Sequence, residues 1–456
     1  MKKLLCLFLV AALIFTSFTG CANNKAEETT EKVPDKTESS QTDSKPADSK
    51  ATDSKPTELT FWTFNELHIQ FFDDAAATWN TAHPDQQIEL KTEVYPYDEM
   101  HNKLLIALQS GTGAPDLADI EISKFANYLK GSNPALVPLN DVVEPIKDKL
   151  IMSRMDNYAK DGKYYGVDYH VGATVMYYNT EILDKAGVNI DDIKTWADYV
   201  EAGKKVVAAT GIPMTTTEVT EHWSYYPLIS QRGSDFFAAD GSVILDNQTN
   251  IDTLQFLYDG LYKDKIAVPA PGGFHHSEEY WAFMNKGGAA SLMMPMWYMN
   301  RFTNYMPDLK GKIAIRPLPL WEEGGNRSAG MGGTGTVVTV QSKEQDLAKA
   351  FLAEAKLSKE GSIKTWTILG FDPIRWDAWS DPAMSADNEF TAYFGKGIFD
   401  MLVEIKDEIG PTQIKELYPD AVTLVQKNVV FKALQEQSQT PEEALKEAAN
   451  ELRAKQ

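Results

Sequence analysis

The sequence predicts a large α/β protein with two domains. From Glu58 onward, short apolar runs rich in β-branched and aromatic residues alternate with stretches whose apolar residues recur every three or four positions. This alternation is typical of a largely parallel sheet covered by helices. The chain has 456 residues, more than a single hydrophobic core usually organises, so two α/β domains are expected. No period of roughly 20 to 50 residues repeats, which excludes solenoids and propellers.

The alternation is clearest in the first part of the folded chain. The first helix is indicated by the spacing of Ile69, Phe72, Ala76 and Trp79, and Pro84 follows its end. Gly111 ends the second helix. The expected elements are a strand at 59–64, a helix at 68–83, a strand at 87–95, a helix at 97–109 and a strand at 115–122.

A stretch at 164–188 separates this set of elements from a second one. It contains two extended runs, 164–167 and 174–179, followed by a short helix that Thr180 can cap. Between the two runs lie Asp168, Tyr169 and His170, at the end of a buried strand. The ends of strands are where an α/β sheet places its ligand, although a core strand with a polar end would look the same.

The second set of elements also alternates. The expected elements are a helix at 195–209, a strand at 212–216, helices at 221–231 and 250–264, apolar runs at 289–297 and 312–318, a strand at 336–340, and helices to the end of the chain.

The N-terminus indicates export. Met1, Lys2 and Lys3 form a positive start, and the apolar run at 4–18 is too short for a stable membrane span. Phe18-Thr19-Gly20-Cys21 resembles a bacterial lipobox, in which the Cys is lipidated, with Phe18 in place of the more usual Leu. We therefore expect a signal peptide at 1–20 and lipidation at Cys21; an ordinary signal peptide with an incidental Cys is the alternative.

The segment 21–57 is expected to be a disordered tether. It repeats Asp-Ser-Lys-Pro motifs and contains almost nothing apolar, so it cannot bury enough surface to fold. The chain holds two Cys, Cys6 in the signal and Cys21 at the anchor. The mature protein would therefore lack a disulfide and any Cys for metal binding or nucleophilic chemistry.

Composition and charge limit the partners. The chain is 43% hydrophobic and 24% charged, as in an ordinary globular protein. It carries 44 Lys and Arg against 65 Asp and Glu, a formal net charge of −21. Such an excess of acid argues against nucleic acid or an anionic lipid surface as the main partner. The expected link to a membrane is the lipid anchor alone.

Several motifs resemble one protein family, the extracellular sugar-binding proteins of ABC importers. In that family a Gly-x-x-Tyr-Gly-x-Pro segment is followed by a Tyr-Tyr-Asn strand, and here the order is the same, with Asp168 in place of Pro. The segment Ser110–Asp116 is similar to the family's Ser-Gly-x-x-x-Pro-Asp turn, and Thr195-Trp196 to its Thr-Trp-x-Glu helix. The resemblance extends from Glu58 to the end of the chain, and is strongest to the proteins that bind maltose-, lactose- and arabinose-type sugars or their oligomers.

The resemblance implies a two-lobed, periplasmic-binding-protein-like fold of type II. Two α/β domains would be joined by a hinge of several segments, with a ligand cleft between them that closes on the sugar. The expected N-terminal lobe comprises 58–170 and 318–360, and the C-terminal lobe 171–317 and 361–456. The protein would act as a monomer on the outer face of the bacterial cytoplasmic membrane and deliver sugar to two permease subunits driven by a cytoplasmic ATPase.

Sugars present apolar C–H faces and rims of hydroxyl groups. A protein holds the faces with aromatic rings and the rims with polar side chains. Such residues lie at the expected strand ends and loops, and the separated aromatic positions favour an oligosaccharide, arabino-oligosaccharide first and lactose- or maltose-type sugars next. Trp62, Trp223 and Trp297 are the preferred stacking rings, because they match family positions and have polar neighbours. The candidate sugar-binding residues are Trp62, Asn65, Glu66, Glu121, Asp168, His170, Trp223, His275, Trp281, Trp297, Gly332, Gly333, Arg375 and Trp376.

Two other motifs are rejected as cofactor or metal sites. Residues 330–335 match G-x-G-x-x-G, but a strand rather than a helix is expected to follow, so a dinucleotide site is not expected. His275 and His276 precede Glu278 and Glu279, but adjacent histidine side chains diverge and a polar loop is the simpler interpretation. We therefore expect no cofactor and no metal.

A glycoside hydrolase is the main alternative function. It would need two carboxylates about 5–10 Å apart, and Glu66, Glu121 or Asp168 could provide them. No eightfold βα pattern, G-x-S-x-G or H-E-x-x-H motif accompanies them. A surface adhesin is disfavoured because the expected structure is not all-β. The sequence therefore predicts a binding protein rather than an enzyme.

Overall fold

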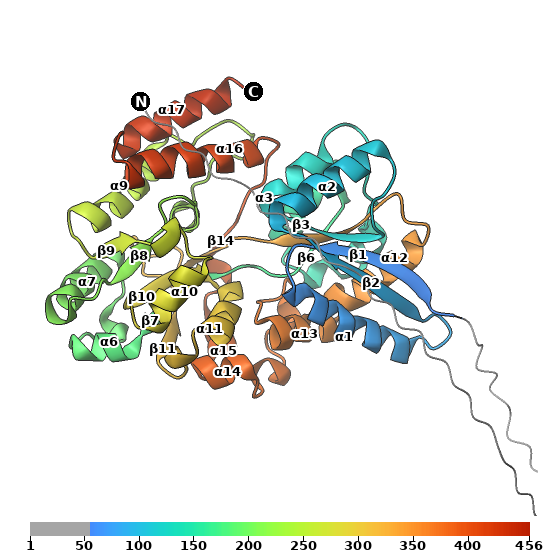
Figure 1. Cartoon of the computed structure of the whole chain (residues 1–456), viewed down its shortest axis with the longest axis horizontal. Coiled ribbons are helices and arrows are strands. Elements are labelled where there is room, and N and C mark those ends of the chain that lie inside the picture. Colours follow the sequence, from blue (N-terminus) through green and yellow to red (C-terminus); the bar gives the residue numbers. More distant parts are fainter. Residues whose placement is uncertain (1–54) are drawn as a thin grey trace, which may run out of the picture. The chain divides into compact units, whose positions relative to one another are not determined.

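The structure, a computed structural model, describes residues 55–456 (Figure 1). The predicted signal peptide, the lipidated Cys21 and nearly all of the predicted tether lie outside the described residues. Within residues 55–456, no helix has the length and apolar character needed to cross a bilayer. All described residues belong to one compact unit, which holds a five-stranded sheet, a three-stranded sheet and three two-stranded sheets.

The first sheet has five strands in the order β2-β1-β3-β13-β6. Strand β1 pairs in parallel with β2 and β3, whereas β13 runs antiparallel to both β3 and β6. Strand β13 comes from late in the chain, so this sheet is completed by a segment more than 200 residues after β3. We call this sheet and its helices the first lobe. Its strands are β1 (Thr57–Thr63), β2 (Ile88–Val94), β3 (Leu117–Glu121), β6 (Val167–Asp168) and β13 (Thr334–Val338).

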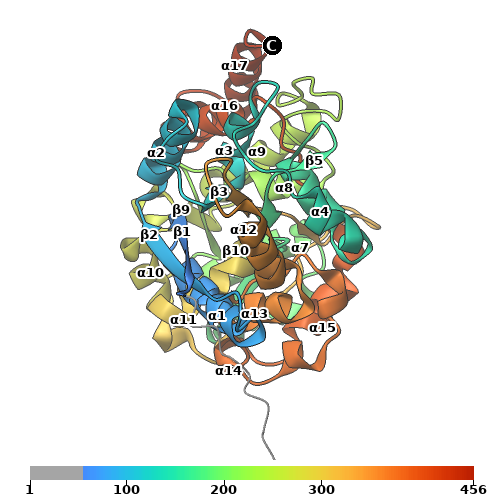
Figure 2. The same ribbon diagram turned by 90° about the vertical axis from the view of Figure 1, so that its right-hand side faces the viewer.

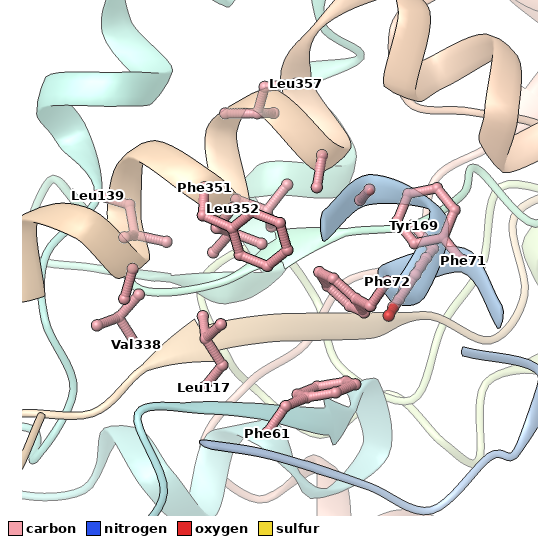
Figure 3. Close-up of a cluster of buried hydrophobic side chains, with 14 of the residues drawn as sticks. Phe61, Phe71, Phe72, Leu117, Leu139, Tyr169, Val338, Phe351, Leu352 and Leu357 are labelled. Atoms are coloured by element: carbon pink, nitrogen blue, oxygen red, sulfur yellow. The ribbon is translucent and has the colours of Figure 1, made fainter. Parts of the chain in front are cut away.

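Side chains alternate across the first sheet, as the pleat requires. Leu59 and Phe61 pack on one side against Phe72 of α1 and Phe351 of α12, and Figure 3 shows this cluster. Trp62 points to the other side, into the core formed with α2. Helices α1 and α13 lie side by side (Figure 2). The helices of this lobe are α1 (Leu67–Ala82), α2 (Tyr97–Ser110), α3 (Ile122–Phe125), α4 (Asn140–Val143), α5 (Met152–Met155), α12 (Gln345–Leu352), the π-helix Ala353–Leu357 and α13 (Lys359–Leu369).

The second sheet has three strands in the order β10-β7-β11, and both outer strands run antiparallel to β7. The expectation of a largely parallel sheet is therefore wrong for this part of the chain. The alternation of strands and helices shows which residues form strands, but not which strands pair. We call this sheet and its surroundings the second lobe. Its strands are β7 (Thr174–Asn179), β8 (Thr215–Thr217), β9 (Ala267–Pro269), β10 (Ser291–Pro295) and β11 (Ile313–Arg316), with β8 pairing with β9.

The helices expected at 195–209 and 250–264 are present in the second lobe as α7 and α9, with ends shifted by one or two residues. The helix expected at 221–231 begins only at Tyr226, because residues 218–225 form a loop that carries Trp223. Helices α9 and α17 and the π-helix Val425–Gln435 enclose a further core. The helices are α6 (Thr180–Lys185), α7 (Trp196–Thr210), α8 (Tyr226–Gln231), α9 (Gln248–Tyr262), α10 (Glu278–Asn285), α11 (Met299–Tyr305), α14 (Glu389–Phe394), α15 (Ile398–Glu404), α16 (Tyr418–Leu424) and α17 (Pro441–Arg453).

The chain passes between the two sheets at residues 168–174, at 327–334 and near 370–376, and these passages are bonded to one another. The backbone N–H groups of Gly172 and Ala173 donate to the buried carboxyl of Asp372, at 3.2 and 2.7 Å. Met331 N donates to Gly172 O at 2.9 Å. Short pairs flank the passages: β4 (Ala159–Lys160) with β5 (Lys163–Tyr164), and β12 (Ser328–Ala329) with β14 (Ile409–Gly410).

Candidate functional site

Three rings of the second lobe form an aromatic cluster beside the passages. Trp297, two residues after β10, lies edge-on to Trp223, with ring centroids 5.5 Å apart at 78°. His276 stacks on Trp297 at 5.4 Å and 21°. All three rings are half-buried, so part of each remains open to solvent. We call Trp223, His276 and Trp297 the aromatic cluster.

The glycines of the passage at 327–334 make room for this cluster. The indole Nε1 of Trp297 donates to Met331 O at 3.0 Å. A Cβ on Gly332 would lie 2.9 Å from the same nitrogen, and Gly332 has a φ of +71°, so only glycine fits here without strain. Gly332 therefore lies where a side chain would collide with a neighbouring group. That group is the Trp297 ring. His170, also predicted for the site, lies 6.4 Å from the Trp297 ring centre.

A buried carboxyl holds the two loops that carry the aromatic cluster. Glu218, directly after β8, accepts hydrogen bonds from the backbone N–H of Trp223 at 3.0 Å and of His275 at 2.8 Å. The side chain is completely buried, and this burial raises the pKa of Glu218 to about 8. His275 lies inside the lobe, with its Nε2 2.9 Å from Thr216 Oγ1, so it supports the loop instead of facing outward. Glu218 is not predicted from the sequence, because no motif surrounds it.

The buried state of Glu218 makes stability depend on pH. Its folded-state pKa lies above the ordinary value of 4.5, so the folded protein holds this proton more tightly than the unfolded chain does. Relative to the Glu218→Gln variant, which does not titrate, the wild type should therefore lose stability as pH rises from about 4.5 to about 8. At about 1.4 kcal/mol per pKa unit, the difference in unfolding free energy should change by an amount on the order of 3–5 kcal/mol. Urea unfolding of both proteins across this pH range measures their free energies of unfolding. A difference between the two free energies that stays constant with pH would contradict the prediction.

The first lobe contributes polar and aromatic groups at the end of β3. Glu121 accepts hydrogen bonds from Tyr97 Oη at 2.9 Å and from Ser123 N at 2.8 Å, and burial raises the pKa of Glu121. The half-buried ring of Phe64 lies edge-on to Tyr97, with centroids 5.2 Å apart. Like the aromatic cluster, this group combines aromatic rings with polar side chains that hydrogen bonds hold in place.

Glu221 of the second lobe faces this end of the first lobe. Burial raises the pKa of Glu221 to about 7, and charges of the first lobe act on it as well, Lys124 lowering it and Glu121 raising it. Gln426 donates to Glu221, and its amide nitrogen lies 3.1 Å from His222 Nδ1. Helix α16 lies against α3, so the two lobes meet here. Glu221 and Gln426 are not among the binding residues that the sequence predicts, because only the fold brings them opposite α3.

Some predicted residues are held in other ways. Trp62 is only 6% exposed; its ring packs edge-on against Tyr95, and the Lys103 ammonium lies over it at 4.3 Å. Asn65 Oδ1 accepts a hydrogen bond from Leu67 N at 3.2 Å, at the start of α1. The neighbouring Glu66 is exposed. Their roles in sugar binding stay predictions.

Asp168 lies fully buried inside the passages. Its carboxylate pairs with the guanidinium of Arg154 at 2.8 Å and accepts hydrogen bonds from Thr334 N at 3.0 Å and Tyr169 N at 2.9 Å. Burial acts to raise the pKa of Asp168, but Arg154 and other positive charges prevail and hold it below its ordinary value. Gly333 is also buried, and a Cβ there would lie 2.5 Å from Arg154 Nη2. The structure thus gives Asp168 and Gly333 clear structural roles.

The remaining predicted residues lie around the aromatic cluster or away from it. Trp281 stacks face to face on Tyr305 at 4.1 Å, and its Nε1 donates to the carbonyl of His275 at 3.1 Å. Arg375 pairs with Asp377 at 2.6 Å. Trp376 is 49% exposed and lines a cavity together with Arg154. The residues of the aromatic cluster do not line this cavity.

The carboxylates and histidines of residues 55–456 form no group of three or more that could hold a metal ion. His275 and His276 point to different partners, Thr216 and Trp297. Of the acids considered for hydrolysis, Asp168 is engaged by Arg154 and Glu121 by Tyr97 and Ser123. The arrangement is suited to holding a ligand between aromatic faces and fixed polar groups.

Comparison with known proteins identifies the family. Residues 65–361 match the family of bacterial extracellular solute-binding proteins. This chain belongs to that family. Arabinooligosaccharide-binding proteins are among its relatives. The one from Bacillus subtilis is 54% identical over 401 residues, covering 88% of this chain and 92% of that protein. The one from Halalkalibacterium halodurans is 54% identical over 398 residues, covering 87% and 89%.

Solved structures of solute-binding proteins share the fold. The GacH receptor of Streptomyces glaucescens, determined in unliganded form and with acarbose, superposes with a TM-score of 0.72 at 20% identity, covering 88% of this chain and 98% of that one. A sequence identity of 20% shows a shared fold and nothing about the ligand. The predicted two-lobed α/β fold and the resemblance to this family are thereby confirmed. The domain boundaries and the sugar-binding residues stay predictions.

Proposed function

We propose that this solute-binding protein captures an arabinose-containing oligosaccharide outside the cell and delivers it to an ABC importer. The observation that carries the proposal is the 54% identity, over nearly nine-tenths of the chain, to proteins named for arabinooligosaccharide binding. At this identity and coverage the same loops and strand ends are expected to surround the ligand. Lactose- and maltose-type sugars are the next candidates.

The aromatic cluster is the proposed platform for the sugar rings. Trp223 and Trp297 meet nearly at right angles and each remains partly exposed, so an adjacent pair of sugar rings can stack on different faces. Glu121 and Tyr97 of the first lobe, and Glu221 and Gln426 of the second, are the proposed partners of the hydroxyl groups. A hydroxyl left without a partner in a closed site costs about 1–3 kcal/mol, so these groups would select among sugars.

Capture proceeds by closure of the lobes. The aromatic cluster belongs to the second lobe and the Glu121 group to the first, so a sugar that touches both favours the closed arrangement. Ligand shifts the balance between open and closed forms only by its preference for the closed one. The passages at 168–174, 327–334 and 370–376 are the proposed hinge, because they connect the two sheets.

The family supports an importer as the partner, and the N-terminal motif around Cys21 supports the proposed location. The closed protein would act as a monomer and dock on two permease subunits, with an ATPase on the cytoplasmic side. A lipid on Cys21 would hold it on the outer face of the cytoplasmic membrane. It would act without a cofactor and release its sugar unchanged, so it is not an enzyme; a glycoside hydrolase is the alternative.

Calorimetric titration of the chain from Ala22 onward tests this function. Arabinotriose and longer arabino-oligosaccharides should bind at one site, with roughly tenfold or greater preference over lactose and maltose, because each misplaced hydroxyl loses about 1 kcal/mol or more. Chromatography should recover the sugar intact. Shortened products would establish a hydrolase instead, and tighter binding of lactose or maltose would change the assigned sugar.

A further inference from the structure

A cavity of about 330 Å³ lies beside the passages, apart from the aromatic cluster. Gly330 lines it, whereas Gly332, two residues further on, faces the Trp297 ring. Neither Trp223 nor Trp297 lines the cavity. It is therefore a different place from the proposed oligosaccharide site.

One end of the cavity is built from fixed polar groups. Arg154 is buried, and its Nε and Nη2 are taken by Asp168 at 3.1 and 2.8 Å, but its Nη1 has no hydrogen-bond partner. A Cβ on Gly330 would lie 3.3 Å from this nitrogen, 3.3 Å from Gly410 O and 3.5 Å from Thr412 Oγ1. The missing side chain of Gly330 thus leaves a space beside a free donor and two oxygen atoms. Gly410 O already accepts from Gly330 N at 2.7 Å and Thr412 Oγ1 donates to Gly330 O at 2.8 Å, so each oxygen keeps a lone pair for a further donor. A buried guanidinium N–H without a partner favours an occupant that accepts a hydrogen bond.

The walls of the cavity are apolar and aromatic. The indole rings of Trp376 and Trp379 line it, and Val171, Ile409 and Pro411 add apolar surface. The indole nitrogens are already used, by Asp148 O at 3.0 Å and Pro373 O at 2.8 Å. Trp379 is only 3% exposed, so it backs the wall, whereas Trp376 is 49% exposed and offers carbon surface and a π-face that suits the C–H face of a sugar.

The charges around the cavity disfavour an anion. Asp168 already neutralises Arg154, and the buried carboxyl of Asp372 also acts on it. At the mouth, Lys406 pairs with Asp407 at 2.9 Å. An anion would thus meet paired cations and carboxylates, whereas neutral hydroxyl groups fit the same donor and acceptors without a charge penalty.

We propose that this cavity is a second binding site, which takes a single neutral sugar or polyol of monosaccharide size. One hydroxyl oxygen accepts from Arg154 Nη1, and hydroxyl hydrogens donate to the remaining lone pairs of Gly410 O or Thr412 Oγ1. The carbon face of the ligand lies on the exposed indole of Trp376. The site does not depend on which oligosaccharide binds at the aromatic cluster.

Saturation-transfer NMR with free arabinose tests the proposal on the chain from Ala22 onward. The arabinose signal should persist in Trp297→Ala, which removes a ring of the aromatic cluster. It should fall roughly fivefold or more in Gly330→Ala, whose methyl group fills the polar end, and in Thr412→Val, which removes a hydroxyl. Gly260→Ala is the matched control, because a Cβ there meets only Ala267 at 3.9 Å.

Other results would overturn the second site. An arabinose signal that is lost in Trp297→Ala but kept in Gly330→Ala and Thr412→Val would place all binding at the aromatic cluster. Absence of any signal in the wild type, or in Gly260→Ala, would count against it as well. Broadening of the inorganic phosphate signal by the wild type but not by Gly330→Ala would show that the cavity takes an anion. Failure of the oligosaccharide titration would leave the arabinose result in Trp297→Ala unaffected, so the two proposals fail separately.

Discussion

Replacing Trp297 with alanine is expected to weaken oligosaccharide binding by roughly 30- to 300-fold, or about 2–3 kcal/mol. The ring lies at the centre of the aromatic cluster, between Trp223 and the stacked His276. Its loss removes a sugar-stacking face and also the support that His276 rests on. Isothermal titration with the oligosaccharide that binds the wild type measures the change.

Two further variants make this result specific. Trp297→Phe keeps an aromatic face but loses the hydrogen bond to Met331 O, so its affinity should lie between those of the wild type and the alanine variant. Trp376→Ala removes an exposed ring that does not touch the aromatic cluster, and it should change the affinity by about twofold or less. Equal losses in Trp376→Ala and Trp297→Ala would contradict the placement of the site. Unfolding curves of each variant separate lost contacts from lost folding.

Replacing Arg154 with methionine is expected to lower the free energy of unfolding by about 3–5 kcal/mol. Both Arg154 and Asp168 are buried, so the substitution leaves a carboxylate without its counter-charge in the interior. It also removes the hydrogen bond from Arg154 to Gly332 O. Urea unfolding at neutral pH, followed by tryptophan fluorescence, measures the loss.

Matched variants show whether burial is the cause. Lys147→Met breaks an exposed ion pair with Glu144 and should leave the unfolding curve nearly unchanged, because water screens such pairs. Adding Asp168→Leu to Arg154→Met removes the uncompensated charge and should recover part of the lost stability. An Arg154→Met protein as stable as the wild type would show that the pair contributes little. If oligosaccharide affinity fell in Asp168→Asn without a loss of stability, the sequence-based assignment of Asp168 to the sugar site would stand.

The candidate site was predictable where local pattern and family motif coincide. Trp223 and Trp297 were selected from the sequence, and the structure brings their rings within 5.5 Å of each other. Glu218 and Glu221 were not selected, although both lie in the same loop as Trp223. No local pattern marks them; their importance comes from contacts with residues 57 and 205 positions away, His275 and Gln426.

The sequence by itself determined where the long helices α1, α2, α7 and α9 and the strands of the first lobe's parallel part form, because side-chain periodicity and end signals such as Gly111 act over a few residues. It also determined the family, through motifs that lie close together along the chain. Only the tertiary structure decided how strands pair: β13 inserts between β3 and β6, and β7 lies between two antiparallel neighbours. It also decided that Asp168 is buried against Arg154. Strand pairing and side-chain burial depend on which distant segments pack together in the folded core. A local sequence pattern does not specify those contacts.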